Sequence, residues 1–253
     1  MVIAKYFVWF VFYSFVGWVY ESILCSVEEK HLINRGFLNG PVCPIYGTGA
    51  ILVILLLGRI ENSGLLFVLG VLVTGVLEYA TSYAMEKLFH AKWWDYSERR
   101  FNIGGRICLI GMIVFGLMSV IIIKLVHPMV VYATAKIPQI ILAVIAAVTF
   151  LMMAFDTTYT VIHIKGFDKK LSNLHAKLQE NLRASLEEAH PLAAIEKAKR
   201  EFKEIDLKLR LDEAAAAFKE RMNYQEKRML TAFPKWKSVN HNDIVERIKN
   251  SLR

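Results

Sequence analysis

The sequence has few cysteines, and their spacing gives them no evident chemical role. Only three are present (Cys25, Cys43 and Cys108), with no C-x-x-C pair and no histidine beside them at metal-ligand spacing. Tetrahedral zinc usually needs four clustered ligands, and thiols near a cytoplasmic membrane boundary stay reduced. We therefore expect inert thiols, no metal site and no cofactor.

Motifs for nucleotide hydrolysis and for nucleophilic catalysis are missing as well. The chain contains no G-x-x-x-x-G-K-[ST] sequence, so it is not itself an ATPase. The histidines at 31, 90, 127 and 163 are scattered, and no nucleophile–base pair can be recognised. These absences count against an enzyme without excluding one.

Apolar residues and charges are distributed unequally along the chain. Hydrophobic residues make up 55% of the sequence, above the roughly 45–50% of an average soluble domain. Residues 165–253 nevertheless hold 20 of the 31 Lys and Arg and 14 of the 23 Asp and Glu. This break predicts a transmembrane domain over 1–164 and a basic helical tail over 165–253.

Five apolar segments are candidates to cross a membrane, which takes about 20 residues each. The second is short and opens with Pro41 and Pro44, and the fourth should close at His127-Pro128. The expected spans are Ile3–Leu24, Val42–Leu57, Leu65–Met85, Ile107–Val126 and Pro138–Ile162. The predicted fold class is all-α, a polytopic membrane helix bundle of about five transmembrane helices with a helical hairpin or coiled-coil tail.

Basic residues orient this bundle. The loop at 86–106 carries five, the loop at 25–41 carries two and the tail carries twenty, against four on the opposite side. Because cytoplasmic loops are enriched in Lys and Arg, we expect a multi-pass protein of the cell membrane. Its N-terminus should lie outside and its tail in the cytoplasm.

The tail carries leucines at helical spacing, from Leu171 to Leu186, and a second run from Ile195 to Leu209 after His190-Pro191. Two such helices can bury each other's apolar stripes. A partner or oligomer interface is the alternative, and the basic excess could also hold the tail against anionic lipid. Charges alternate in sign along the tail, which is typical of a solvated helix, so nucleic-acid binding is not expected.

Several charged residues should gather near the cytoplasmic ends of the helices, where buried charge usually faces a cavity or a partner. Glu78, Ser82 and Glu86 share one helical face, and Arg35 and Arg106 could neutralise such acids or hold a phosphate. Two loops, 34–47 and 93–106, are rich in Gly, Pro and Trp, and the first could be re-entrant. The candidate cluster, for substrate binding or for structure, is Glu21, Asn34, Arg35, Glu78, Ser82, Glu86, Trp93, Trp94, Asp95, Tyr96, Asn102 and Arg106.

Five motifs in this order resemble a bacterial membrane family, the one labelled putative ABC transporter permease, type IV. They are Tyr13–Glu21, Asn34–Gly47, Glu78–Glu86, Trp93–Ser97 and Phe101–Cys108. The resemblance covers about residues 1–130 and leaves the tail out. It implies a permease subunit that works with a separate ATP-binding subunit, and five spans are few for a lone pore, so a homodimer would be expected.

Three functions are therefore open. The first is a transporter permease subunit with a polar cavity that faces the cytoplasm, among membrane lipids. The second is a membrane-embedded enzyme or binder of a lipid or lipid-linked phosphate, with an acid such as Asp95 as general base. The third is a membrane scaffold or signalling protein that acts through its helical tail.

Overall fold

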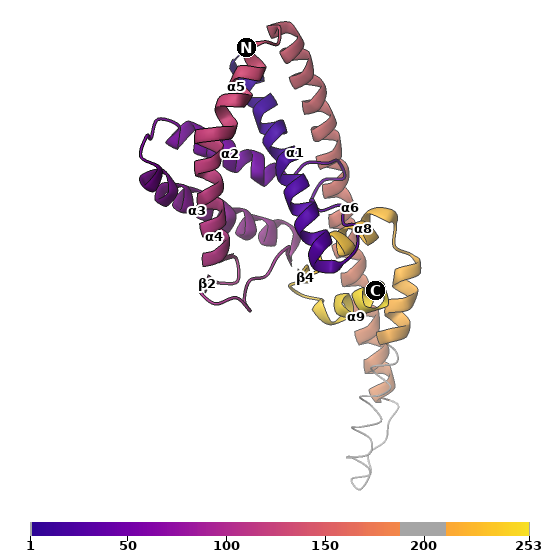
Figure 1. Ribbon diagram of the computed structural model, residues 1–253. Coiled ribbons are helices and arrows are strands. Elements are labelled where there is room, and N and C mark those ends of the chain that lie inside the picture. Colours follow the sequence, from indigo (N-terminus) through magenta and orange to yellow (C-terminus); the bar gives the residue numbers. More distant parts are fainter. Residues whose placement is uncertain (1, 188–210, 253) are drawn as a thin grey trace.

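The computed structural model describes residues 2–187 and 211–252, and the regular secondary structure of this part is almost entirely helical (Figure 1). The chain is an all-α membrane bundle, as predicted. Its helices are α1 (Val2–Glu29), α2 (Pro44–Leu57), α3 (Ser63–Phe89), α4 (Leu109–Ile121), the π-helical turn η1 (Ile122–Val126), α5 (His127–Ala135), α6 (Gln139–Glu187), α8 (Tyr224–Ala232) and α9 (Asn242–Leu252). Residues 211–220 are helical too.

Four helical segments of the described chain are long and apolar enough to cross a membrane: α1, α3, the continuous stretch Leu109–Ala135, and Gln139–Glu180 of α6. The second expected span differs, because α2 has only 14 residues, fewer than the roughly 20 that a crossing needs. The Gly- and Pro-rich stretch before it is irregular, and Pro44 occupies the first helical turn, where proline is tolerated. The described residues thus give four full-length spans and one short apolar helix.

The fourth span does not close at His127-Pro128 as predicted. The helix widens into η1, in which the His127 N–H donates to Ile122 O, and continues as α5 to Ala135. Proline lacks the backbone N–H of an ordinary helical residue and crowds the preceding turn. A π-helical turn at this point is one of the recognised ways in which a helix accommodates such a defect.

The fifth span does not end at Ile162 either, because α6 runs unbroken through Lys165 to Glu187. Ile164, Phe167 and Leu171 recur at helical spacing, and each is buried. Apolar contacts therefore continue along α6 beyond the membrane segment. The second tail run, residues 195–209, lies outside the described residues, so the hairpin stays a prediction.

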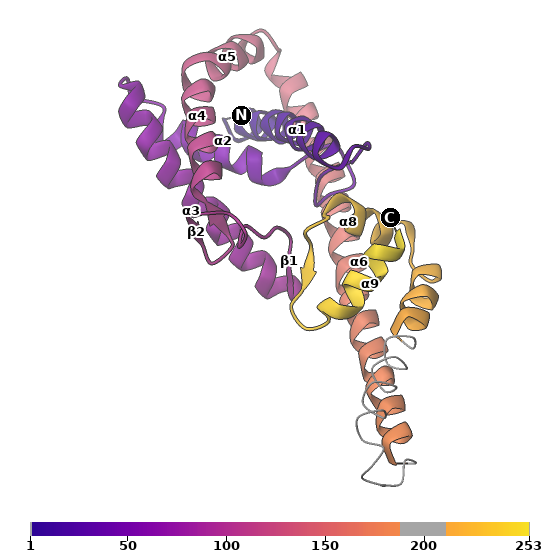
Figure 2. The same ribbon diagram turned by 60° about the horizontal axis from the view of Figure 1, so that its bottom comes forward.

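The described tail packs onto one end of the bundle, beside the lower half of α6 in both ribbon views (Figures 1 and 2). Strand β4 (Lys237–Ser238) pairs antiparallel with β1 (Ala91–Lys92), just after α3. The largest buried cluster joins three groups of residues. They are Phe89 at the end of α3 with Ala91 and Trp93 after it; Ile164, Phe167 and Leu171 of α6; and Ala215, Phe218, Met222, Met229, Leu230, Ala232, Phe233, Trp236, Ile244, Val245 and Ile248 of the tail.

Helices α1 and α2 approach each other closely through glycines. The Cys43 N–H donates to Ser14 O at 2.9 Å, so α2 begins beside the middle of α1. A Cβ atom at Gly47 would lie 2.5 Å from Phe10 O and 2.1 Å from Ser14 Oγ. Small residues allow membrane helices to reach such distances. The start of α2 is therefore fixed halfway along α1, as a re-entrant segment would be.

We expect Gly47→Ala to destabilise the protein, because the added methyl group meets the backbone of α1. Overpacking of this kind costs about 1–3 kcal/mol, and a drop of several degrees in Tm should be visible by thermal unfolding in detergent. Gly166→Ala is the matched control, because a Cβ there has nothing within 4 Å. An equal Tm for the two variants would contradict the close contact.

Candidate functional site

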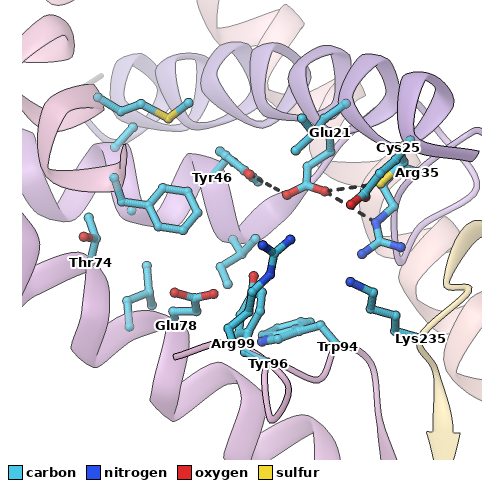
Figure 3. A pocket seen from close by; sticks show the side chains of 18 of the residues that line it. Glu21, Cys25, Arg35, Tyr46, Thr74, Glu78, Trp94, Tyr96, Arg99 and Lys235 are labelled. Atoms are coloured by element: carbon cyan, nitrogen blue, oxygen red, sulfur yellow. Dashed lines mark hydrogen bonds and ion pairs between the residues drawn. The ribbon is translucent and has the colours of Figure 1, made fainter. Parts of the chain in front are cut away.

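A cavity of about 290 Å³ opens between α1, α2, α3 and α4, and the loop after β1 and residues 234–235 of the tail complete its wall. Figure 3 shows Glu21 and Tyr46 approaching it from one side and Glu78, Trp94 and Tyr96 from the other. The buried end is formed by small and apolar residues, among them Ala50, Val53 and Phe115. The exposed end carries charge from Glu28, Arg99 and Lys235. The cavity is therefore amphipathic along its length.

Glu21 is fully partnered inside this cavity. The Tyr46 hydroxyl donates to its Oε1 at 2.6 Å, and Arg35 Nε lies 3.4 Å from its Oε2 (Figure 3). Arg35 also stacks on the Phe233 ring, 4.4 Å from its centroid, and donates to Ala232 O. Arg35 thus joins the loop before α2 to α1 and to the end of α8.

Glu78 contrasts with Glu21, because part of its carboxylate is unpaired. The residue is only 6% exposed, and Oε2 has no hydrogen-bond partner within residues 2–187 and 211–252. Tyr96 lies close to it: burial first, and then the charge of Glu78, raises the pKa of Tyr96 well above its ordinary value. The phenol therefore stays protonated, while one buried carboxyl oxygen is left to accept a bond from elsewhere.

The loop that carries Tyr96 is rigid. Asp95 Oδ1 accepts from the Ser97 N–H at 2.9 Å, and Asp95 Oδ2 pairs with Lys237 Nζ at 2.8 Å. Gly105 has φ +68°, and a Cβ there would lie 2.7 Å from Asp95 Oδ1, so only glycine fits. Strands β2 (Asn102–Ile103) and β3 (Ile107–Cys108) close the loop as a short hairpin that leads into α4.

The irregular segment before α2 is held by α6 and α8. Asp156 accepts from the Asn39 N–H at 3.1 Å and from the Gly40 N–H at 2.8 Å. Arg228 donates to Gly36 O at 3.2 Å and to Phe37 O at 3.1 Å. A carboxylate and a guanidinium from distant segments thus satisfy backbone groups that no helix or strand would satisfy.

The structure brings half of the predicted cluster to the cavity. Six residues line it, namely Glu21, Arg35, Glu78, Trp94, Asp95 and Tyr96. The other six lie elsewhere: Asn34 accepts from Trp18, Trp93 is in the core beside the tail, Asn102 braces its own hairpin, and Arg106 pairs with Glu86 at 2.9 Å and bonds Ser82.

Sequence reasoning missed several residues of the cavity. Tyr46 belongs to the motif Asn34–Gly47, but nothing in the sequence was a reason to assign it a role. Arg99 was only one of five basic residues in its loop. Lys235 comes from the tail, and nothing local in the sequence connects it to the membrane helices. For residues 2–187 and 211–252, no group of three or more His, Cys, Asp or Glu is placed to hold a metal ion.

Comparison with known proteins gives one finding. The family model described as "Putative ABC-transporter type IV" matches residues 8–161. No curated protein and no solved structure matches the chain. The match continues past residue 130, where the resemblance in the motifs ended. It covers α3 and the stretch Leu109–Ala135 whole, α1 and the apolar part of α6 in part, and most of the cavity lining.

We expect Asp95→Asn to loosen the β1–β4 contact, because it removes the charge that Lys237 pairs with. Burial raises the pKa of Asp95, but hydrogen bonds from Lys237 and Ser97 outweigh it and hold that pKa well below its ordinary value. The stabilisation is therefore present above the ordinary value of about 4 and is lost as the pH falls below it.

Hydrogen exchange at the Val239 amide, which donates to His90 O, measures this contact. Lys237 is half exposed, so exchange at neutral pH should quicken only about two- to fivefold in the variant. The difference from wild type should shrink on acidification. Glu61→Gln, at the far end of the bundle, is the control. An effect of Asp95→Asn that does not change with pH would contradict the stabilisation of the β1–β4 contact by the Asp95–Lys237 ion pair.

Proposed function

The chain belongs to the family described as "Putative ABC-transporter type IV", and on this premise we propose that it is the membrane-embedded permease subunit of a transporter. Its substrate site is the cavity between α1, α2, α3 and α4. Six of the predicted residues, Glu21, Arg35, Glu78, Trp94, Asp95 and Tyr96, contribute to that site, whereas Arg106 with Glu86 and Ser82 braces the helices.

The amphipathic cavity is the observation that carries this proposal. It runs from buried apolar side chains between four apolar helices to an exposed charged end. Substrate sites of transporters lie among membrane helices that are short or interrupted, and α2 is short and begins beside the middle of α1. One buried carboxylate of the cavity, Glu78, has an oxygen to which no described residue donates a hydrogen bond.

The energy source in this proposal is a separate ATP-binding subunit, because the chain contains no phosphate-binding G-x-x-x-x-G-K-[ST] motif. Its docking surface is the end of the bundle where the two basic loops meet the tail. The subunit works among membrane lipids, and a homodimer supplies the further helices that a transport path needs.

The proposed orientation puts the N-terminus outside and the tail, residues 165–253, in the cytoplasm. Contacts between the loops and the tail support it. The loop before α2 reaches α8 through Arg35 and Ala232, and the loop after α3 pairs with β4. Lys124 meets the carbonyls of Ile60 and Glu61 near the other end of α3. The basic loops and the basic tail therefore gather at one end, as the positive-inside rule requires.

Single cysteines at Gly64 and Gly166 test this orientation. In a background that lacks Cys25, Cys43 and Cys108, we expect a membrane-impermeant maleimide on whole cells to label position 64. Position 166 should react only after the membrane is opened. Labelling of both positions from the same side would overturn the topology.

Purification of the tagged chain from its own membrane in mild detergent tests the permease role. We expect an ATP-binding protein to co-purify. Gly49→Leu, which adds a side chain at the cavity wall, should lower the ATPase rate of that complex several-fold without dissociating it. Gly166→Leu, outside the cavity, should leave the rate unchanged. Repeated recovery without any ATPase would refute the permease role.

A further inference from the structure

Two ion pairs account for four of the charges at the cavity. Glu21 is paired with Arg35, and Asp95 is paired with Lys237 behind the wall. Glu78, Arg99 and Lys235 also line the cavity. None of these three forms an ion pair with the described part of the chain. A ligand that fills the cavity can therefore pair with these groups, by donating a hydrogen bond to the carboxylate and by placing an anion beside the cations.

These three groups lie at two different positions along the cavity. Glu78 is buried and stands one helical turn from Thr74, next to the apolar end. Arg99 and Lys235 are exposed, at the open end. Glu28 and Glu29 also line this end, so its two cations and two acids balance in formal charge once the Glu21–Arg35 pair is set aside.

The apolar end accepts a hydrocarbon group. Val53, Phe115, Met118 and Ile122 line it, and Ser119, which also lies there, has its hydroxyl bonded back to Phe115 O. Among the residues that the structure describes, no charged side chain lines the cavity beyond Glu78 in this direction. A ligand that fills this end must therefore bury carbon and offer no unpaired polar atom.

We propose that the cavity binds a single-chain amphiphile in which a hydroxyl or amide N–H lies between the alkyl chain and a phosphate head. The chain fills the apolar end, the donor bonds the free oxygen of Glu78, and the phosphate meets Arg99 and Lys235. This assignment rests on the proposed function, since it takes the cavity to be the substrate site. Phosphate is favoured because several N–H donors can converge on its oxygens.

The size of the cavity selects one chain rather than two. Its volume is about 290 Å³, at the lower limit of the roughly 300–1,000 Å³ that ligand pockets usually offer. A lipid with two acyl chains would leave one of them outside. A lysophospholipid has one chain, a free hydroxyl and a phosphate in the required order, and an acyl-chain phosphate with an amide linkage has the same order.

The test uses the full-length chain in nanodiscs of phosphatidylcholine, with intrinsic tryptophan fluorescence, to which Trp94 at the cavity contributes, and native mass spectrometry as readouts. The probe is myristoyl lysophosphatidic acid. Three comparison ligands each change one feature of the probe. They are the analogue of the probe that lacks the hydroxyl, monomyristoyl glycerol, which lacks the phosphate, and a phosphatidic acid with two acyl chains. We expect saturable binding of the probe, and binding weaker by about tenfold or more for each of the others.

Variants assign each group of the ligand to its partner. Arg99→Ala with Lys235→Ala should lower the affinity for the probe about tenfold or more and leave monomyristoyl glycerol unaffected. The matched control, Arg100→Ala with Lys227→Ala, removes two exposed cations that do not line the cavity. Glu78→Leu should abolish the preference for the hydroxyl over its analogue. The comparison of ligands on wild type holds even if that variant does not fold.

Equal affinity for all four ligands, or equal losses in the test and control pairs, would overturn the amphiphile assignment. This result is distinguishable from failure of the permease role. An ATPase complex that responds to Gly49→Leu but does not bind the probe keeps the permease and excludes this ligand. Selective binding of the probe without any ATPase keeps the ligand and assigns the cavity to a lipid-binding protein.

Discussion

Charge at the ends of apolar helices must find partners, and the rest of the structure depends on this constraint. A carboxylate or guanidinium removed from water is costly unless ion pairs and hydrogen bonds replace its hydration. Glu21 finds Tyr46 and Arg35, and Asp156 finds the backbone of Asn39 and Gly40. Tyr46 belongs to the first turn of α2, and the other partners come from the irregular segment before α2, which is thereby fixed against α1 and α6.

The same constraint separates bracing residues from the candidate site. Arg106 looked able to hold a ligand, but it is occupied by Glu86 and by the rings of Tyr79 and Tyr83. Glu78, one turn earlier on α3 than Ser82, keeps a buried oxygen that has no partner in the described part of the chain. A group in that condition is costly to the fold, and its retention beside a cavity is typical of a binding function.

The tail belongs to this network and is more than an appendage. Arg35 reaches α8, Arg228 reaches the carbonyls of Gly36 and Phe37, and Lys235 stands at the cavity wall. Because α6 passes without interruption from the membrane segment into this region, tail and bundle share one core. A partner that displaced the tail would therefore alter the cavity as well as the surface.

Composition and periodicity were enough to predict the all-α membrane bundle and most of its apolar spans, and they offered the pairing of Arg35 and Arg106 with acids as one of two alternatives. Those features follow from hydrophobic length and from charge, which are local properties of the chain. The extension of the fourth helix past Pro128, the short α2 and the continuous α6 depended on backbone geometry and on packing partners. The cavity itself was decided only by tertiary structure, because Tyr46, Glu78, Arg99 and Lys235 come from four separate segments. No local pattern states which of those segments will meet.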